Sequence, residues 1–96
     1  MFKATLNNTE VVITAFTRNT YFTEELINST GYIAVNDADI TIPELYELAQ
    51  EPITSFIIKK DGTTIYDTGT IDAQITSIDE NLIEDRVAVN INLRFN

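Results

Sequence analysis

Threonine and isoleucine dominate this chain, each occurring fourteen times among its 96 residues. Their β-branched side chains hold χ1 nearly rigid, which suits the pleated surface of a strand and crowds the turns of a helix. Only three glycines and two prolines are available to stop or turn such strands. We therefore expect a mostly β protein (all-β or α+β), an antiparallel meander or sandwich of about six strands in which residues 1–96 form a single domain.

Two hairpins are predicted from their turn residues. Asn7-Asn8 tolerates positive φ and lies between two apolar runs, so we expect a tight turn near the N-terminus. Asp61-Gly62 favours a two-residue turn of type I′, which would pair Ile58 with Ile65. The second hairpin would open a three-stranded antiparallel meander over residues 53–95.

The register of the last strand pair follows from its apolar faces. Residues 70–78, after Gly69, form the next expected strand, and a shift by one residue would turn its isoleucines towards water. Pairing Ile75 with Val87 brings the apolar faces of the two strands together. The connecting loop would then be centred on Asn81.

One short helix is predicted, over residues 43–50. Three apolar side chains share one face at i, i+3 and i+4 spacing: Leu45, Leu48 and Ala49. The opposite face carries three carboxylates: Glu44, Glu47 and Glu51. Pro43 suits the first helical position, because the residue before a proline is biased against helical φ and ψ. Two turns of helix are not stable alone in water, so this helix must dock on the sheet.

The segment 17–32 shows no clean hydrophobic period, and a short helical turn after Thr23 would fit part of it. A connection this long in a small domain is either functional or an element that the pattern does not reveal. It contains three aromatic residues: Tyr21, Phe22 and Tyr32. They would bind a protein partner if exposed, or pack as satellite core beneath the loop. We expect any partner-binding surface to lie in this segment.

Missing residue types exclude several kinds of chemistry. The chain has no cysteine and no histidine, which removes disulfides, thiolate ligands, cysteine nucleophiles and the side chain that titrates near neutral pH. Asp37 and Asp39 resemble the start of a calcium loop and are weak candidates for a cation site. The positions of that loop that need glycine and glutamate hold Ile42 and Leu48 instead. We expect no enzyme activity, no cofactor and no bound metal.

The net charge of −9 opposes direct binding to the phosphates of nucleic acids and to an anionic membrane surface. The N-terminal residues lack the apolar stretch of a signal peptide, so we expect none. No apolar run is long enough to span a bilayer.

The stretch Ile57–Gly69, IIKKDGTTIYDTG, and the closing strand Arg86–Phe95 resemble the small β-rich virion proteins of tailed bacteriophages and prophages. Those proteins are typically acidic, lack cysteine and are rich in threonine, asparagine and isoleucine. They act in the assembly of the head, connector, tail or baseplate, often as symmetric oligomers. The resemblance implies a homo-oligomeric assembly protein located in the virion or the host cytoplasm.

Three functions stay open at this point. The first is a non-enzymatic structural or protein-interaction module, a virion assembly component that binds a protein partner or itself. The second is an acidic inhibitor that imitates nucleic acid and blocks a basic groove, for which Glu44, Glu47 and Glu51 form a short stripe of carboxylates. The third is a carbohydrate-binding module, which the absence of tryptophan disfavours.

Overall fold

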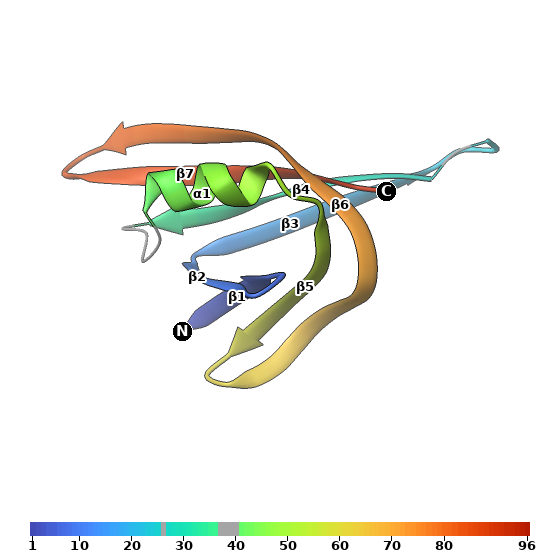
Figure 1. Cartoon of the computed structure of the whole chain (residues 1–96), viewed down its shortest axis with the longest axis horizontal. Coiled ribbons are helices and arrows are strands. Elements are labelled where there is room, and N and C mark those ends of the chain that lie inside the picture. Colours follow the sequence, from blue (N-terminus) through green and yellow to red (C-terminus); the bar gives the residue numbers. More distant parts are fainter. Residues whose placement is uncertain (26, 37–40) are drawn as a thin grey trace.

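The computed structural model describes residues 1–25, 27–36 and 41–96. In these residues it shows a helix, α1 (Ile42–Ala49), and seven strands: β1 (Phe2–Leu6), β2 (Thr9–Ile13), β3 (Ala15–Phe22), β4 (Ile27–Asn36), β5 (Ile53–Lys60), β6 (Thr63–Ile83) and β7 (Arg86–Phe95). The strands form a single antiparallel sheet in the order β2-β1-β5-β6-β7-β4-β3 (Figure 1). The expectation of a mostly β chain with one short helix is confirmed.

The sheet curls until its two ends meet. β2 and β3, the two ends of the strand order, are separated in the chain only by Thr14. The backbone N–H of Thr14 donates a hydrogen bond to the Ala34 carbonyl oxygen at 2.9 Å. The chain thus passes at Thr14 from pairing with β1 to pairing with β4. β1 begins at Phe2, which pairs with Ile13 on one side and with Lys60 on the other. The contact between the two ends of the sheet stops at Thr14. Among the described residues, β3 therefore pairs with β4 on one side and with no strand on the other.

The hydrophobic core fills the inside of the curled sheet. Its buried members come from α1 and from every strand except β3: Ala4, Leu6, Val11, Ile13, Ile33, Val35, Leu45, Leu48, Ile53, Phe56, Ile58, Ala73, Val89, Ile91, Leu93 and Phe95. Phe56 is fully buried, with its ring centroid 5.0 Å from that of Phe16 and 6.1 Å from those of Tyr66 and Phe95. One aromatic cluster therefore joins β3, β5, β6 and β7.

The helix α1 docks on the sheet against β6. Leu45 and Leu48 are buried, which confirms the predicted docking face. The helix begins at Ile42, so Pro43 is the second helical residue. The prediction that Pro43 would be the first is wrong. Thr41 precedes it in an extended conformation without a side-chain cap hydrogen bond. A proline fits this position because the first N–H groups of a helix have no partner within it.

The two predicted hairpin turns form. Both residues of Asp61-Gly62 have positive φ, 49° and 85°, as a type I′ turn requires, and Asn7 has a φ of 56°. A bulge two residue pairs away from the Asp61-Gly62 turn shifts the register of β5 against β6 by one residue. Ile58 therefore lies opposite Tyr66 and not Ile65, and that part of the prediction is wrong. The shift leaves Ile65 54% exposed.

The strand β6 is one bent strand of 21 residues and is not interrupted at Gly69. Gly69 has a φ of 69°, which glycine adopts without strain, and its N–H donates to Asp67 Oδ1 at 2.8 Å. The pairing of β6 with β5 shifts register around this glycine. A strand bent in this way allows the sheet to curl (Figure 1).

The predicted register of the last strand pair is wrong. Ile75 lies opposite Leu93 and not Val87. The connection is the two-residue turn Glu84-Asp85, whereas a loop centred on Asn81 was the expectation from a constant register. The strands thus continue past Asn81 to Ile83 and Arg86, which displaces the predicted pairing by six residues. With a constant register the two-residue turn would place Ile75 opposite Arg94, and the one-residue bulge next to Ile75 restores an apolar partner.

The segment 17–32 is not an irregular connection, because it forms most of the antiparallel hairpin of β3 and β4. The predicted helical turn after Thr23 does not form in residues 23–25. The inward positions of β3 beyond Phe16 hold Arg18 and Thr20, which bond to a side chain on β4. Polar residues thus occupy the inward face, which holds apolar residues on the other strands. The alternation typical of a strand is therefore hidden in the sequence.

Candidate functional site

A two-stranded arm projects from one end of the sheet (Figure 1). β4 pairs with β7 as far as Ser29, and from there to the tip it pairs with β3 alone. We define the arm as residues 20–25 and 27–28. A two-stranded hairpin is at best marginally stable on its own in water, so the arm must be held at its base or covered by a partner.

Arg18 fastens the base of the arm to the sheet. Its Nε donates to Oγ of the buried Ser29 at 2.7 Å, and its Nη1 donates to Tyr66 Oη at 3.0 Å. The guanidinium carbon lies 4.2 Å from the centre of the Phe95 ring, a cation–π contact. The Thr20 hydroxyl lies 3.1 Å from that of Ser29 and completes the group. Contacts to β4, β6 and β7 therefore fix the direction in which the arm leaves the body.

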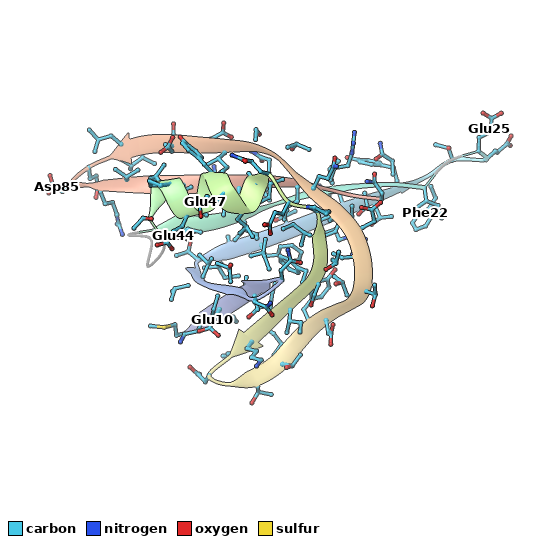
Figure 2. The ribbon with its side chains drawn as sticks, viewed as in Figure 1. Glu10, Phe22, Glu25, Glu44, Glu47 and Asp85 are labelled. Carbon is cyan, nitrogen blue, oxygen red and sulfur yellow. The ribbon has the colours of Figure 1, made fainter. Side chains whose placement is uncertain are left out.

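The arm ends in exposed apolar side chains. Phe22 is 75% exposed, and Ile27, its partner across the hairpin, is 67% exposed. Alternation along the strands places both on the face that forms the core further back. Glu24 and Glu25 are also exposed, and Figure 2 shows Glu25 at the outermost point of the arm beyond Phe22. The tip is therefore an apolar pair beside two negative charges.

The structure divides the three predicted partner-binding aromatics between two places. Tyr21 and Phe22 lie on the arm, are exposed and do not pack as satellite core. Tyr32 lies further back on β4, beside β7, and is 39% exposed. Ile27 lies on the arm beside Phe22 and was not among the predicted residues. Only the pairing of β3 with β4 reveals Ile27, because the sequence around it has no clear strand pattern.

An apolar pocket of about 280 Å³ opens at the place where β3 has no second neighbour. Its walls include six apolar residues: Phe2, Ile13, Phe16, Ile58, Ile65 and Tyr66. Phe2 and Ile65 are 41% and 54% exposed and so face the solvent at its mouth. Lys60 stands beside it, with Nζ 5.6 Å from the centre of the Phe2 ring. The pocket depends on the curl of the sheet and on a bulge, neither of which the sequence reveals.

A second apolar group is exposed at the turn between β6 and β7. Leu82 is 78% exposed, and its cross-strand partner Val87 is 46% exposed. Ile83, beside them, is 53% exposed. Figure 2 shows Asp85 of this turn at the end of the molecule opposite Phe22. Both ends of the long axis therefore carry apolar hairpin tips.

The predicted carboxylate stripe lies on the outer side of α1. Its three members, Glu44, Glu47 and Glu51, are exposed and line one shallow depression together with Thr9 and Leu48. Figure 2 shows Glu44 and Glu47 along the helix. The spacing expected from the sequence thus brings the three carboxylates to one face.

Tyr46, on the same helix, donates a hydrogen bond from its hydroxyl to Glu80 Oε2 at 2.7 Å. This bond raises the pKa of Tyr46 above its ordinary value of 10.0, and desolvation and the negative charge of Glu80 act in the same direction. The contact ties α1 to β6.

The weak metal candidates Asp37 and Asp39 lie outside the described residues, so that site stays a prediction from the sequence. Within residues 1–25, 27–36 and 41–96, acidic side chains do not gather in threes as the ligands of a metal ion would. In the same residues, no helix has the length and apolar character needed to cross a membrane.

Comparison with known proteins identifies no relative. No protein-family model, no curated protein and no solved structure matches the chain. The resemblance of residues 57–69 and 86–95 to virion proteins therefore stays a prediction from the sequence.

Proposed function

We propose that this chain is a non-enzymatic protein-interaction module and that the arm is its contact element. The observation that carries the proposal is the exposure of Phe22 and Ile27, side by side at the end of a two-stranded hairpin. Full burial of a phenylalanine side chain contributes about 1.5–3 kcal/mol, so a partner that covers this pair gains a large part of its affinity from it. Aromatic residues of this kind dominate the binding energy of many protein–protein contacts.

The arm is also prepared for binding before a partner arrives. Its base is fixed by the hydrogen bonds of Arg18 to Ser29 and Tyr66. A contact element that is already ordered loses less conformational entropy on binding than a flexible loop. Fixed geometry and exposed apolar side chains together favour an interface over a free loop.

We propose the assembly of a tailed-phage virion as the setting of this interaction. The support is the resemblance of residues 57–69 and 86–95, the acidic composition without cysteine, and a contact element that reaches away from the body. The partner would be another virion protein or a further copy of this chain.

A photo-crosslinking amino acid at position 22 tests the proposal. Benzoylphenylalanine would replace Phe22 in the purified protein, which is irradiated alone and in an extract of its source cells. The control carries the same amino acid at Asp72, an exposed position on β6 outside the arm. We expect protein adducts from position 22 and a much lower yield from position 72. Equal yields from the two positions would contradict the proposal.

A double variant, Tyr21→Ser with Phe22→Ser, separates a contact role from a structural one. Both side chains are exposed, so we expect the thermal midpoint to stay within about 4 °C of the original protein. Added without a crosslinker as a competitor, the substituted chain should need at least a tenfold higher concentration than the original chain to suppress crosslinking from position 22, because its anchoring ring is gone. A much larger fall of the midpoint would assign the two residues to the fold and not to an interface.

The carboxylate stripe supports a second candidate function, the inhibitor that imitates nucleic acid. Glu44, Glu47 and Glu51 share one exposed face and one depression. Binding to a basic nucleic-acid-binding protein would weaken as salt rises, because salt screens exposed charges. It would also disappear in the variant with all three residues replaced by glutamine. Binding that survives these three replacements would exclude this function for the stripe.

A further inference from the structure

We infer that the arm binds a second copy of this chain and that its tip enters the apolar pocket beside β3 of that copy. The inference rests on the proposed function of the arm and names its receptor. Three features support it: the size and lining of the pocket, the charges around the pocket and the tip, and the direction of the arm.

The pocket has room for the ring of Phe22. Its volume is about 280 Å³, whereas an apolar cavity of about 150 Å³ is enough to bind benzene. Its walls are aliphatic and aromatic, with half-buried Phe16 and Tyr66 and the exposed Ile65 among them. A phenyl ring that enters it exchanges water for carbon contacts on most of its surface.

One lysine, Lys60, stands beside this pocket on the face of the sheet that carries Phe2. The chain has a net charge of −9, yet its three lysines, Lys3, Lys59 and Lys60, all lie where β1 pairs with β5. Lys3 sits directly opposite Lys59, an arrangement of like charges that destabilises a strand pair. Lys3 is paired with Glu10 at 3.2 Å, whereas Lys59 and Lys60 have no ion-pair partner among the described residues. Lys3 and Lys59 line a separate depression on the opposite face with Glu10 and Asp61, so Lys60 is the lysine that a carboxylate at the pocket would meet.

The tip of the arm brings such carboxylates. Glu24 and Glu25 are exposed next to Phe22 in the chain. When the Phe22 ring occupies the pocket, they come close to Lys60 at its mouth, whose Nζ is 5.6 Å from the Phe2 ring centre. The largely acidic remainder of the surface repels the tip, so charge directs it to this end of the molecule. Apolar fit and charge therefore select the same place.

The direction of the arm requires the pocket of a different copy. The arm points away from the N-terminus and from the β5–β6 turn, which lie at the other side of the body (Figure 1). The tip and the pocket are two different surfaces, so each copy offers one of each and contacts two neighbours. Such a head-to-tail contact builds a closed ring if its rotation closes and an open filament if it does not.

A mixing experiment with two variants tests this arrangement. Phe22→Ser removes the tip, and Ile65→Glu blocks the pocket with a charge that also repels the tip. Both positions are exposed, so both variants should fold. Light scattering should show rings or filaments for the original protein and monomers for each variant, because loss of the buried ring weakens the contact about tenfold or more. An equal mixture of the two variants should form dimers, because one intact tip meets one intact pocket.

Charge reversal gives an independent test. Lys60→Glu should prevent assembly, and so should Glu24→Lys combined with Glu25→Lys. Mixing these two variants should restore rings or filaments in which the two variants alternate, because each tip then meets a pocket of opposite charge. The matched control is Leu82→Ser, which removes an apolar side chain of similar exposure from the β6–β7 turn and should leave assembly unchanged.

Each other outcome overturns the inference. An original protein that stays monomeric at millimolar concentration has no second copy as its partner, although adducts from position 22 to another protein would still uphold the proposed function. Assembly of the original protein without rescue in the mixtures would indicate a contact between two like surfaces. Loss of assembly in Leu82→Ser alone would show that the contact is made by the β6–β7 turn and not by the arm.

Discussion

Replacing Arg18 by methionine tests whether one guanidinium fastens the arm to the sheet. The change removes the hydrogen bonds to Ser29 Oγ at 2.7 Å and to Tyr66 Oη at 3.0 Å. It also removes the cation–π contact with Phe95 at 4.2 Å. Methionine keeps an aliphatic stem of similar length, so the change deletes the charge and its bonds more than the packing.

The expected loss of stability follows from these contacts. A hydrogen bond to a charged group contributes about 1.5–3 kcal/mol, and a cation–π contact adds about 0.5–2 kcal/mol. Two terms reduce the total: Arg18 is only half-buried, and Ser29 keeps the Thr20 hydroxyl at 3.1 Å as a partner. We therefore expect a loss of about 2–3 kcal/mol, which in a domain of this size lowers the thermal midpoint by about 10–20 °C.

Urea and thermal unfolding followed by circular dichroism measure this loss. The control is Arg94→Met, because Arg94 is exposed and, among the described residues, its side chain donates a hydrogen bond only to Gln74 Oε1, at 3.4 Å. The control should change the free energy of unfolding by no more than about 0.5 kcal/mol. Amide hydrogens of the arm should also exchange faster in Arg18→Met. Unfolding of the two variants at the same urea concentration would show that Arg18 does not fasten the arm, since it would then stabilise the fold no more than Arg94 does.

Three further predictions concern the body of the fold. Gly31→Ala should cost about 1–3 kcal/mol in urea unfolding, because the added Cβ would lie 2.2 Å from the Thr17 carbonyl oxygen and the backbone would have to shift. Phe56→Ala should cost about 3–5 kcal/mol, because Phe56 is fully buried, and a loss under 1 kcal/mol would contradict the aromatic cluster. Ultraviolet titration should show Tyr46 ionising above pH 10.0, and Glu80→Gln should move its pKa back towards that value. Because the folded pKa is the higher one, the stabilising effect is present below pH 10.0 and is lost as pH rises through the raised pKa.

Local chemistry made part of the fold predictable. Asn7 and Asp61-Gly62 adopt positive φ at the expected turns, because few other residues tolerate that conformation. Leu45 and Leu48 mark the docking face of α1, because helical spacing places them one above the other. These features depend on residues close together in the chain.

Register could not be predicted, because bulges decide it. The strand alternation around Ile75 is locally correct, but the strands continue past Asn81 to the turn at Glu84-Asp85, and a one-residue bulge beside Ile75 then gives it an apolar partner. In the same way, a bulge exchanges Ile65 for Tyr66 opposite Ile58. An inserted residue leaves no mark in composition or period, so a register counted from alternation alone misses it.

Part of the candidate site could likewise be predicted from the sequence, and part could not. Tyr21 and Phe22 stood out as aromatics in a segment without a clear period, and the structure exposes both. Their period is hidden because Arg18 and Thr20 occupy the inward face. The pocket beside β3 could not be predicted, because residues from both hairpins and from β3 meet there only when the sheet curls.

The pairing of β1 with β5 has a consequence for the order of folding. Phe2 lies beside Lys60, so the N-terminal hairpin receives its second neighbour from a strand far along the chain. During synthesis this hairpin leaves the ribosome long before β5 does, and β7, which holds β4, emerges last. Contacts between such distant residues slow folding, and domains dominated by them fold in milliseconds to seconds. The sheet therefore closes only after β7 has been synthesised, and until then its early strands have unpaired edges.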